Sequence, residues 1–439
     1  MIYNIVDYGA VGDGKTVNTK AIQNAIDDCS KAGGGRVLIP SGTFVSGSIW
    51  LKNDIELHFE TPSSILLGST DFADYNPVDA YAQNWKSVGE QTNGGHLLMA
   101  VEVKNISITG YGIIDGNGEA FMNGTRPTDN DTYCFWPQGF SVIADPVNTR
   151  PAQMIAIVES ENIILSGITL RNSTYWTLFL HGCDNVRVHQ IRIENPPHRL
   201  NGDGIDIDCT SNITVSDCII HTADDALTLR ADNNKLKNKD KCTENVVVTN
   251  CILSSGGANA IRIGVGDGHI KNAVFSNLIL TKSVGGIHIQ SKYSDNGQPT
   301  GTHIQNIRFS NVSGTDLRVP LFFNSGFTTA AFMKNISICD SNFDLEHTCG
   351  IIGNNIGEVS GIVWRNLTFN IVKRLKGIDS HEIDCRKYGT HSPCLDTVFM
   401  FTNTEIELDN VQLKFTPEAR AEWKNDMIFG ENVKLTQKD

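Results

Sequence analysis

The sequence has no apolar run approaching the ~18 to 20 residues that a membrane-spanning helix needs. Its first residues, Met1 to Asp7, also lack the basic segment and apolar stretch of a secretory signal. These two absences predict that the protein has no membrane partner. They also predict a cytoplasmic location, unless a signal has been trimmed from the chain.

Basic residues are outnumbered, since 36 Lys and Arg stand against 49 Asp and Glu, which gives a formal net charge of -13. Proteins that grip phosphate backbones carry basic faces, so we expect no nucleic-acid partner. No Cys-x-x-Cys pair is present, which argues against a zinc site. The 11 cysteines are an odd number, so at least one thiol stays unpaired. Cys385 and Cys394 either form a loop disulfide or remain reduced.

One pattern returns along the chain: an asparagine, alternating apolar residues, a small or polar break, and a second apolar alternation. The units begin at Asn105, Asn162, Asn185, Asn212, Asn245, Asn272, Asn306 and Asn335. From Asn162 onward they start 23 to 34 residues apart, which is the length of one solenoid turn. Because the apolar residues alternate with a period of two, each unit forms strands with one buried face rather than a helix. The sequence therefore predicts an all-β parallel solenoid with two strands in each turn.

The repeat asparagines have a structural interpretation. Asparagines at equivalent places on successive coils can stack as a ladder of amides, each hydrogen-bonded to the next. The central breaks, such as Ser-Gly, Ser-Asp and Thr-Asn, suit a bend because small and amide residues tolerate positive φ. We therefore do not assign the repeat asparagines to a site.

A solenoid can absorb all 439 residues as a single domain, because each coil buries its apolar face against its neighbours. Within it we expect residues 1–70 to form an N-terminal cap and the first turns, and residues 398–439 to form a C-terminal cap. Asn18 and Thr19 can cap a short helix that covers the N-terminal strand edges. Residues 118–150 form a long insertion, which is either a wall of a groove or a disordered loop.

Two acidic segments, NGDGIDID and ADDALTLR, lie in successive coils. Asp203 and Asp224 are 224 − 203 = 21 residues apart, just under one turn, so they should stand on neighbouring strands about 4.8 Å apart. Strict alternation would turn Asp203 inward and would point Asp224 and Asp225 in opposite directions. The chain must therefore bend at Gly204 and at Ala223. With these bends, three carboxyl groups share one patch.

Like charges this close cannot all ionise freely, so one carboxyl should keep its proton while another stays anionic. Hydrolysis of a glycosidic bond needs that pair, because one carboxyl protonates the leaving oxygen and another activates water, ~6.5 to 9.5 Å away in inverting enzymes. The competing interpretation is that these aspartates only stabilise turns, as Asp often does. The second acidic segment one coil away favours catalysis.

These residues match a known pattern, and the chain resembles the polygalacturonases of glycoside hydrolase family 28. The segment VDYGAVGDGKTVNTKAIQ is similar to the family's N-terminal cap. The family's Asn-Thr-Asp motif matches Asn201, Gly202 and Asp203, and its Asp-Asp motif matches Asp224 and Asp225. The resemblance implies a right-handed parallel β-helix and an inverting mechanism. It also implies that Asp224 is the general acid and that Asp203 and Asp225 hold the attacking water.

Two other motifs of the family are absent. Its Gly-His-Gly should fall in GGANAIRIG, where Asn259 replaces the histidine. Its Arg-Ile-Lys, which grips a uronate carboxylate, should fall in GGIHIQSK, where His288 and Gln290 stand instead. Cations at other positions can still meet a carboxylate, but the sugar at the cleaved bond need not be galacturonate. The candidate substrate-binding residues are Asn201, Arg230, Asn259, Arg262, His288 and Lys292.

Three aromatic residues, Trp136, Trp176 and Tyr293, are candidates for stacking against sugar rings, because an aromatic face packs well against C–H groups. Core packing or loop anchoring is the competing interpretation for each. No functional prediction depends on them.

The sequence therefore predicts an inverting, exo-acting glycoside hydrolase that cleaves a pectin-related oligo- or polysaccharide and needs no metal or other cofactor. Exo action rests on the long insertion alone. One alternative is a calcium-dependent lyase, in which calcium bridges the carboxylates and Arg262 or Lys292 removes a proton. Another is a non-catalytic glycan-binding solenoid, against which the mutual repulsion of three carboxylates argues. The oligomeric state stays open.

Overall fold

A computed structural model of the chain describes residues 1–77, 79–84, 92–121, 150–196, 199, 201–292, 301–326, 331–372 and 396–438. This part of the chain divides into two compact units, Met1–Asp224 with Asn234–Asp240 and Asp225–Asn233 with Lys241–Asp439. The single domain expected over residues 1–439 stays a prediction. Most of the insertion predicted at 118–150 lies outside the described residues, as do Cys385 and Cys394.

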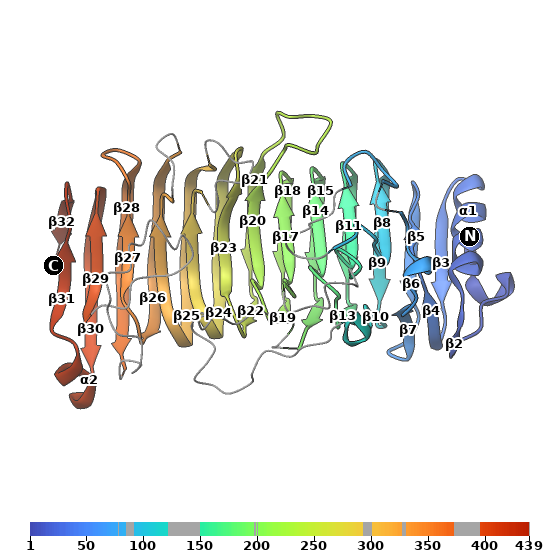
Figure 1. The fold of residues 1–439 in the computed structure, drawn as a ribbon, viewed down its shortest axis with the longest axis horizontal. Coiled ribbons are helices and arrows are strands. Elements are labelled where there is room, and N and C mark those ends of the chain that lie inside the picture. The colour runs from blue at the N-terminus through green and yellow to red at the C-terminus, as the bar shows by residue number, and fades with distance from the viewer. Residues whose placement is uncertain are drawn as a thin grey trace. The chain divides into compact units, whose positions relative to one another are not determined.

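The first unit is built of three rows of parallel strands (Figure 1). The first row comprises β1 (Ile2–Asn4), β3 (Gly35–Ile39), β6 (Ile55–Phe59), β9 (Lys104–Gly110), β12 (Glu161–Ser166), β15 (Asp184–His189) and β18 (Ser211–Ser216). The second comprises β2 (Asp13–Val17), β4 (Gly42–Ser46), β7 (Ser64–Gly68), β10 (Ile113–Asp115), β13 (Thr169–Arg171), β16 (Arg192–Glu194) and β19 (Ile219–Thr222). The third comprises β5 (Ile49–Trp50), β8 (Leu98–Val101), β11 (Ile155–Val158), β14 (Leu178–His181) and β17 (Ile205–Asp208).

The third row corrects the prediction of two strands in each turn. Its strands β11, β14 and β17 are buried at all four positions, on both faces. β11 and β14 are almost wholly apolar, so they lack the alternation of apolar and polar residues by which the other two rows are recognised in the sequence. β17, with the sequence Ile-Asp-Ile-Asp, does alternate and belongs to the acidic segment that was predicted to lie on a strand. A strand that is covered on both faces can be apolar at every position, so a search for alternating residues does not detect it.

The second unit is also built of parallel strands, several of them longer. Its elements are β20 (Leu227–Ala231), β21 (Thr243–Thr249), β22 (Ile252–Ser255), β23 (Asn259–Gly266), β24 (His269–Gln290), β25 (His303–Asn324), β26 (Met333–Leu345), β27 (Cys349–Ile352), β28 (Val359–Ile371), β29 (Thr397–Thr402), β30 (Thr404–Phe415), α2 (Pro417–Glu422), β31 (Asn425–Phe429) and β32 (Lys434–Lys438). All strand pairs are parallel, as in β24 with β25 and β28 with β30. The protein is thus an all-β parallel β-helix, as predicted.

The interior of each unit consists of apolar side chains stacked in register. In the first unit Ile163 lies between Ile106 on β9 and Val186 on β15, and all three are buried. In the second unit Phe275 stacks on Phe309 with ring centroids 4.5 Å apart. Burial of apolar surface on this scale is the main force that holds each coil to the next.

The repeat asparagines form hydrogen-bonded ladders, as predicted. In the first unit Asn162 Nδ2 donates to Asn105 Oδ1 at 2.8 Å, and Asn185 Nδ2 donates to Asn162 Oδ1 at 2.6 Å. In the second unit Asn306 Nδ2 donates to Asn272 Oδ1 at 3.1 Å. These five residues have φ angles of 53° to 58°, in the left-handed region that asparagine tolerates better than most residues. The left-handed conformation predicted for the central breaks is present as well, for example at Asp217 and Asn250.

The predicted N-terminal helix is present as α1 (Thr19–Lys31), at the end of the first unit beside β3. Its buried face consists of Ile22, Ala25, Ile26 and Cys29. Asn18 stands at the N-cap position as predicted, and its carbonyl accepts from Ile22 N at 3.0 Å, but its side chain does not cap the helix. The Asn18 side chain accepts from the backbone N–H of Val11 at 2.7 Å instead of from the helix, and Thr19 Oγ1 accepts from Gly47 N at 2.8 Å. Both side chains join the helix to neighbouring chain segments.

Within the described residues, no helix is both long and apolar enough to cross a membrane. The cysteines described by the structure are all free thiols, and most are buried.

Candidate active site

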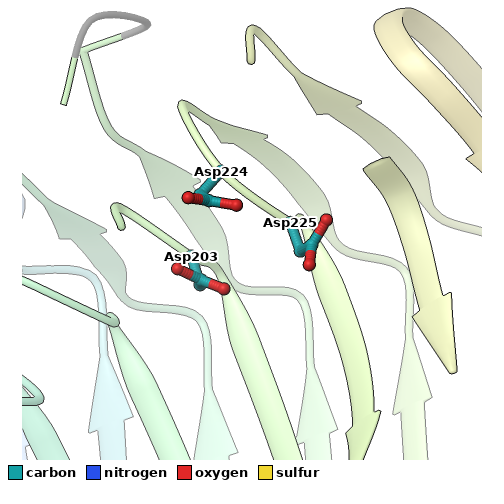
Figure 2. Close-up of side chains that lie close together, drawn as sticks. All are labelled: Asp203, Asp224 and Asp225. Carbon is teal, nitrogen blue, oxygen red and sulfur yellow. The ribbon is translucent and has the colours of Figure 1, made fainter. Parts of the chain in front are cut away.

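Three aspartates converge at one place. Asp203, Asp224 and Asp225 each offer a carboxylate oxygen, and these oxygens lie within 4.8 Å of one another. Figure 2 shows Asp203 on the segment that enters β17, Asp224 on the turn after β19, and Asp225 just before β20. Asp203 and Asp225 are buried, and Asp224 is partly exposed. We refer to these residues as the three-aspartate cluster.

Asp203 is positioned through its own backbone. Its carbonyl oxygen accepts from Thr177 N at 3.0 Å and from Thr177 Oγ1 at 2.7 Å. Asn195 Nδ2 supports this contact, because it donates to Thr177 Oγ1 at 2.7 Å and to the Gly202 carbonyl at 3.1 Å. A bend at Gly204 separates Asp203 from β17, so the side chain does not follow the alternation of the strand. The bend predicted at Gly204 is present.

Asp224 and Asp225 lie in the turn between β19 and β20. Ala223 and Asp224 form a bend, and Thr222 Oγ1 donates to the Asp224 carbonyl at 2.5 Å. The backbone N–H of Ala226 donates to the Asn259 carbonyl at 2.9 Å and so joins the end of the turn to β23. Because the chain bends here, two adjacent carboxyl groups turn toward the same place instead of toward opposite faces of a strand.

The Asp225 carboxylate is held by Asn259. The backbone N and the side-chain Nδ2 of Asn259 both donate to Asp225 Oδ1, at 2.9 and 2.7 Å. The carbonyl oxygen of the same amide lies 3.3 Å from His288 Nδ1. All three side chains are buried. Two of the predicted substrate-binding residues therefore contact each other, and one of them contacts the cluster.

Arg262, Gln290 and Lys292 form a second group of contacts in the same unit. Arg262 lies opposite His288 in the register of β23 and β24, and its Nη2 donates to Gln290 Oε1 at 2.8 Å. Gln290 Nε2 in turn donates to the Lys292 carbonyl at 3.1 Å. Arg262 and Lys292 are both buried. The contact with Gln290 fixes one edge of the Arg262 guanidinium in place.

Arg230 and Asn201 lie at the ends of their segments. Arg230 is partly exposed near the end of β20, and its carbonyl accepts from Thr243 Oγ1 at 2.5 Å. Asn201 adopts a positive φ of 52°, and its Oδ1 accepts from Arg150 Nη2 at 2.8 Å. The Asn201 side chain is thus engaged with a buried arginine.

Two buried arginines that were not among the predicted site residues, Arg150 and Arg199, support the Asn201 turn. Arg150 also donates to the Thr174 carbonyl at 3.0 Å and lies 4.9 Å above the Tyr175 ring. Arg199 donates to the Ser173 carbonyl at 2.9 Å and pairs with Glu119 at 2.8 Å. Burial lowers the pKa of Arg199, and the nearby Glu119 opposes this effect. The position of Arg199 beside the NGD motif could have indicated its role from the sequence. Nothing in the sequence around Arg150 points to such a role.

The model of the family described as glycosyl hydrolases family 28 matches residues 29–241 and 234–357, which include every residue of the cluster. The chain belongs to glycosyl hydrolase family 28. It is therefore a glycoside hydrolase, and the resemblance seen in the motifs is confirmed. This result disfavours a solenoid that only binds glycans.

Individual relatives are similar over most of the chain. The exo-poly-alpha-D-galacturonosidase of Dickeya chrysanthemi is 28% identical, over 84% of this chain and 71% of that protein. The polygalacturonase of Chamaecyparis obtusa is 23% identical, over 94% of this chain and 67% of that protein. Among solved structures, the family 28 exopolygalacturonase of Yersinia enterocolitica has a TM-score of 0.68 at 21% identity, over 100% of this chain and 79% of that one. At that identity the structural likeness speaks for the fold alone.

Of the aromatic candidates, Trp176 is buried. It stacks on Tyr175 with centroids 4.8 Å apart and meets the edge of Phe179 at 5.5 Å. Packing within an aromatic cluster is therefore its role in this family 28 chain. Trp136 and Tyr293 lie outside the described residues.

Proposed function

We propose that this family 28 enzyme hydrolyses a pectin-related oligo- or polysaccharide by one inverting displacement at a chain end. Asp224 protonates the glycosidic oxygen of the leaving sugar. Asp203 and Asp225 hold the water that attacks the anomeric carbon and accept its proton. The observation that carries the proposal is the convergence of three carboxylate oxygens within 4.8 Å on a chain of this family.

The different surroundings of the three aspartates support these roles. The two N–H donors on one oxygen of Asp225 suit an anionic acceptor, as a base that holds water requires. Asp224 is the most exposed of the three, which lets it reach a sugar oxygen that enters from solvent. Like charges held this close also favour a state in which one carboxyl stays protonated, and an acid needs that proton.

The stereochemistry can be measured directly. Inverting enzymes separate the acid and base carboxyl groups by ~6.5 to 9.5 Å, whereas retaining enzymes use ~5 to 5.5 Å. The 4.8 Å limit refers to the nearest oxygens and not to whole carboxyl groups. Inversion is therefore supported by the family motif, and proton NMR of the first product formed will show which anomer is released.

The proposed substrate class is supported by the names of similar proteins and by the position of one arginine, Arg262. Several similar proteins are named as polygalacturonases or exopolygalacturonases, which supports a pectic substrate and attack at a chain end. Arg262, fixed by Gln290, is the candidate donor for an acidic sugar in place of the missing Arg-Ile-Lys. We expect a cleaved bond next to a uronate if Arg262 faces the substrate, and next to a neutral sugar if it does not.

The decisive variant is Asp224→Asn, which removes the transferable proton and keeps the shape of the side chain. We expect turnover of pectic oligosaccharides to fall by about 10²- to 10⁴-fold, with fold and glycan binding retained. Reducing-end release and chromatography of product lengths measure it, and the length series also separates exo from endo action. Asp217→Asn is the matched control, because Asp217 is an exposed aspartate at φ 58° on the turn after β18 and should keep full activity. Near wild-type turnover in Asp224→Asn would refute its role as the acid.

The second candidate is a calcium-dependent lyase on the same scaffold. The observation that favours it is the same group of three oxygens, because Ca²⁺ prefers clustered carboxylates. A lyase would form an unsaturated, ultraviolet-absorbing product and would lose activity in a chelator. We expect neither, since hydrolysis by the three aspartates needs no metal. The cytoplasmic location and the absence of nucleic-acid and membrane partners stay predictions.

A further inference from the structure

The geometry points to a positioning relay in which His288 acts through Asn259 to fix the orientation of Asp225, instead of contacting the substrate. This inference rests on the proposed role of Asp225 in holding water. It reassigns both Asn259 and His288 from substrate binding to support of the cluster. Every residue of the relay belongs to the second unit.

The direction of each hydrogen bond follows from the chemistry of the amide. The Asn259 Nδ2 group can only donate, and it is 2.7 Å from Asp225 Oδ1. The amide oxygen therefore points the other way, toward His288 Nδ1 at 3.3 Å. An amide oxygen can only accept, so Nδ1 of His288 must carry the proton. The relay thus runs from the imidazole N–H through the amide to the carboxylate, and it fixes the side-chain orientation of all three residues.

Gly285 supplies the space that the Asn259 amide occupies. It is the register partner of Asn259 on β24. A Cβ atom at this position would stand 2.0 Å from Asn259 Oδ1 and would displace the amide. On the other side the His288 ring is held by the edge of Phe322, with centroids 5.3 Å apart. The strand sequence around the relay is therefore shaped to accept this amide.

A carboxylate in a cluster of like charges needs such a relay. The last torsion of an Asp side chain is broad, so a carboxyl group without directional donors rotates easily. Repulsion from Asp203 and Asp224, whose oxygens lie within 4.8 Å, would turn Asp225 away from the position in which it holds water. Two donors on Oδ1 hold the group in place and leave Oδ2 for other contacts.

The relay also accounts jointly for two departures from the family pattern. The family resemblance expects a histidine at Asn259 and an arginine at His288. These two positions are 29 residues apart in the sequence, yet their side chains contact each other. A single coupled replacement explains both, whereas two independent substrate contacts would not require the residues to meet.

A double-mutant cycle tests the relay. Asn259→Ala removes the amide donor, and we expect kcat to fall about 10- to 100-fold with little change in KM. His288→Leu should lower kcat about five- to tenfold through the same amide. The double variant should be no slower than Asn259→Ala alone, because both changes break one relay. His288→Asn, whose amide N–H can replace the Nδ1–H donor, should recover most of the kcat lost in His288→Leu.

Several results would overturn the relay. A raised KM with unchanged kcat in His288→Leu would place His288 against the substrate, and additive losses in the double variant would separate it from Asn259. If Asn259→Ala does not fold, as judged by circular dichroism and thermal unfolding, the comparison of His288→Leu with His288→Asn decides alone. Asp225→Asn separates the two proposals. If it abolishes turnover and the cycle is additive, only the relay fails; if it retains turnover, the role of Asp225 fails and the relay with it.

Discussion

The asparagine ladders and the three-aspartate cluster use polar side chains on successive coils in opposite ways. Asn162 both donates to one neighbour and accepts from the other, so the same contact can repeat from coil to coil. Ionised aspartates only accept, and their charges repel each other when stacked. Asp225 therefore depends on a donor of another type, Asn259. Stacking of neutral amides stabilises the fold, whereas clustering of carboxylates costs stability and indicates a chemical role.

Among the variants that test this comparison, we expect the largest effect on turnover for Asp203→Asn. Turnover should fall by about 10²- to 10⁴-fold, because the attacking water loses one of its holders. The free energy of unfolding should not fall, because the substitution removes one of three like charges within 4.8 Å. Kinetics and urea denaturation on the same preparation measure both. A large fall in the free energy of unfolding would instead show that the Asp203 carboxylate stabilises the fold.

The buried residue His96 tests whether a hydrogen-bonded group stabilises the interior only while it is uncharged. His96 Nδ1 donates to the Gln153 carbonyl at 2.9 Å, and its Nε2 accepts from Tyr81 OH at 2.8 Å. Burial lowers the pKa of His96 to about 4, which the hydrogen bond to Gln153 only partly opposes. The unfolded chain, with a His pKa of about 6.5, binds a proton more readily.

The contribution of His96 to the free energy of unfolding is therefore fully present above about pH 6.5 and is lost as the pH falls toward 4. The loss over this window is roughly 3 kcal/mol. Urea denaturation at the two ends of the window gives the difference for the wild type and for His96→Gln. We expect the variant to lose less stability on acidification. An equal loss in both proteins would mean that other groups cause the acid sensitivity.

The smallest effect is expected in the ladder itself. Asn162→Ala removes the side-chain amide but keeps a Cβ atom at φ 58°. It should lower the free energy of unfolding by about 1 to 2 kcal/mol. Asn162→Gly is the control, because glycine accepts this φ without strain and loses only the hydrogen bonds. The difference between the two separates backbone strain from ladder bonding. Both variants should keep wild-type kcat, and a large change in kcat would contradict the purely structural role.

Much of the fold could be predicted because its signals are local and repeated. The period-two alternation after each repeat asparagine gives two of the three strand rows, and the helical spacing from Ile22 to Cys29 gives α1. Apart from β17, the third row was missed because strands such as β14 are buried on both faces and show no alternation. Asn18 stands at the predicted N-cap position, but its side chain does not cap the helix, because it finds a partner in Val11 across a loop.

The candidate site could be predicted in part for the same reason. Asp203, Asp224 and Asp225 follow from the separation of one turn and from two short motifs. The contact between Asn259 and His288 could not be predicted, because it depends on the register of β23 and β24 and on the space left by Gly285. The support of Asn201 by Arg150 likewise joins residues that are 51 positions apart.

Periodicity and spacing are properties of the chain, so they suffice to predict a parallel β-helix whose acidic segments lie one turn apart, and the short motifs suffice to indicate family 28. How the carboxyl groups are held depends on the folded structure. The orientation of a side chain depends on donors from other coils, and these come into reach only when the strands stack in one particular register.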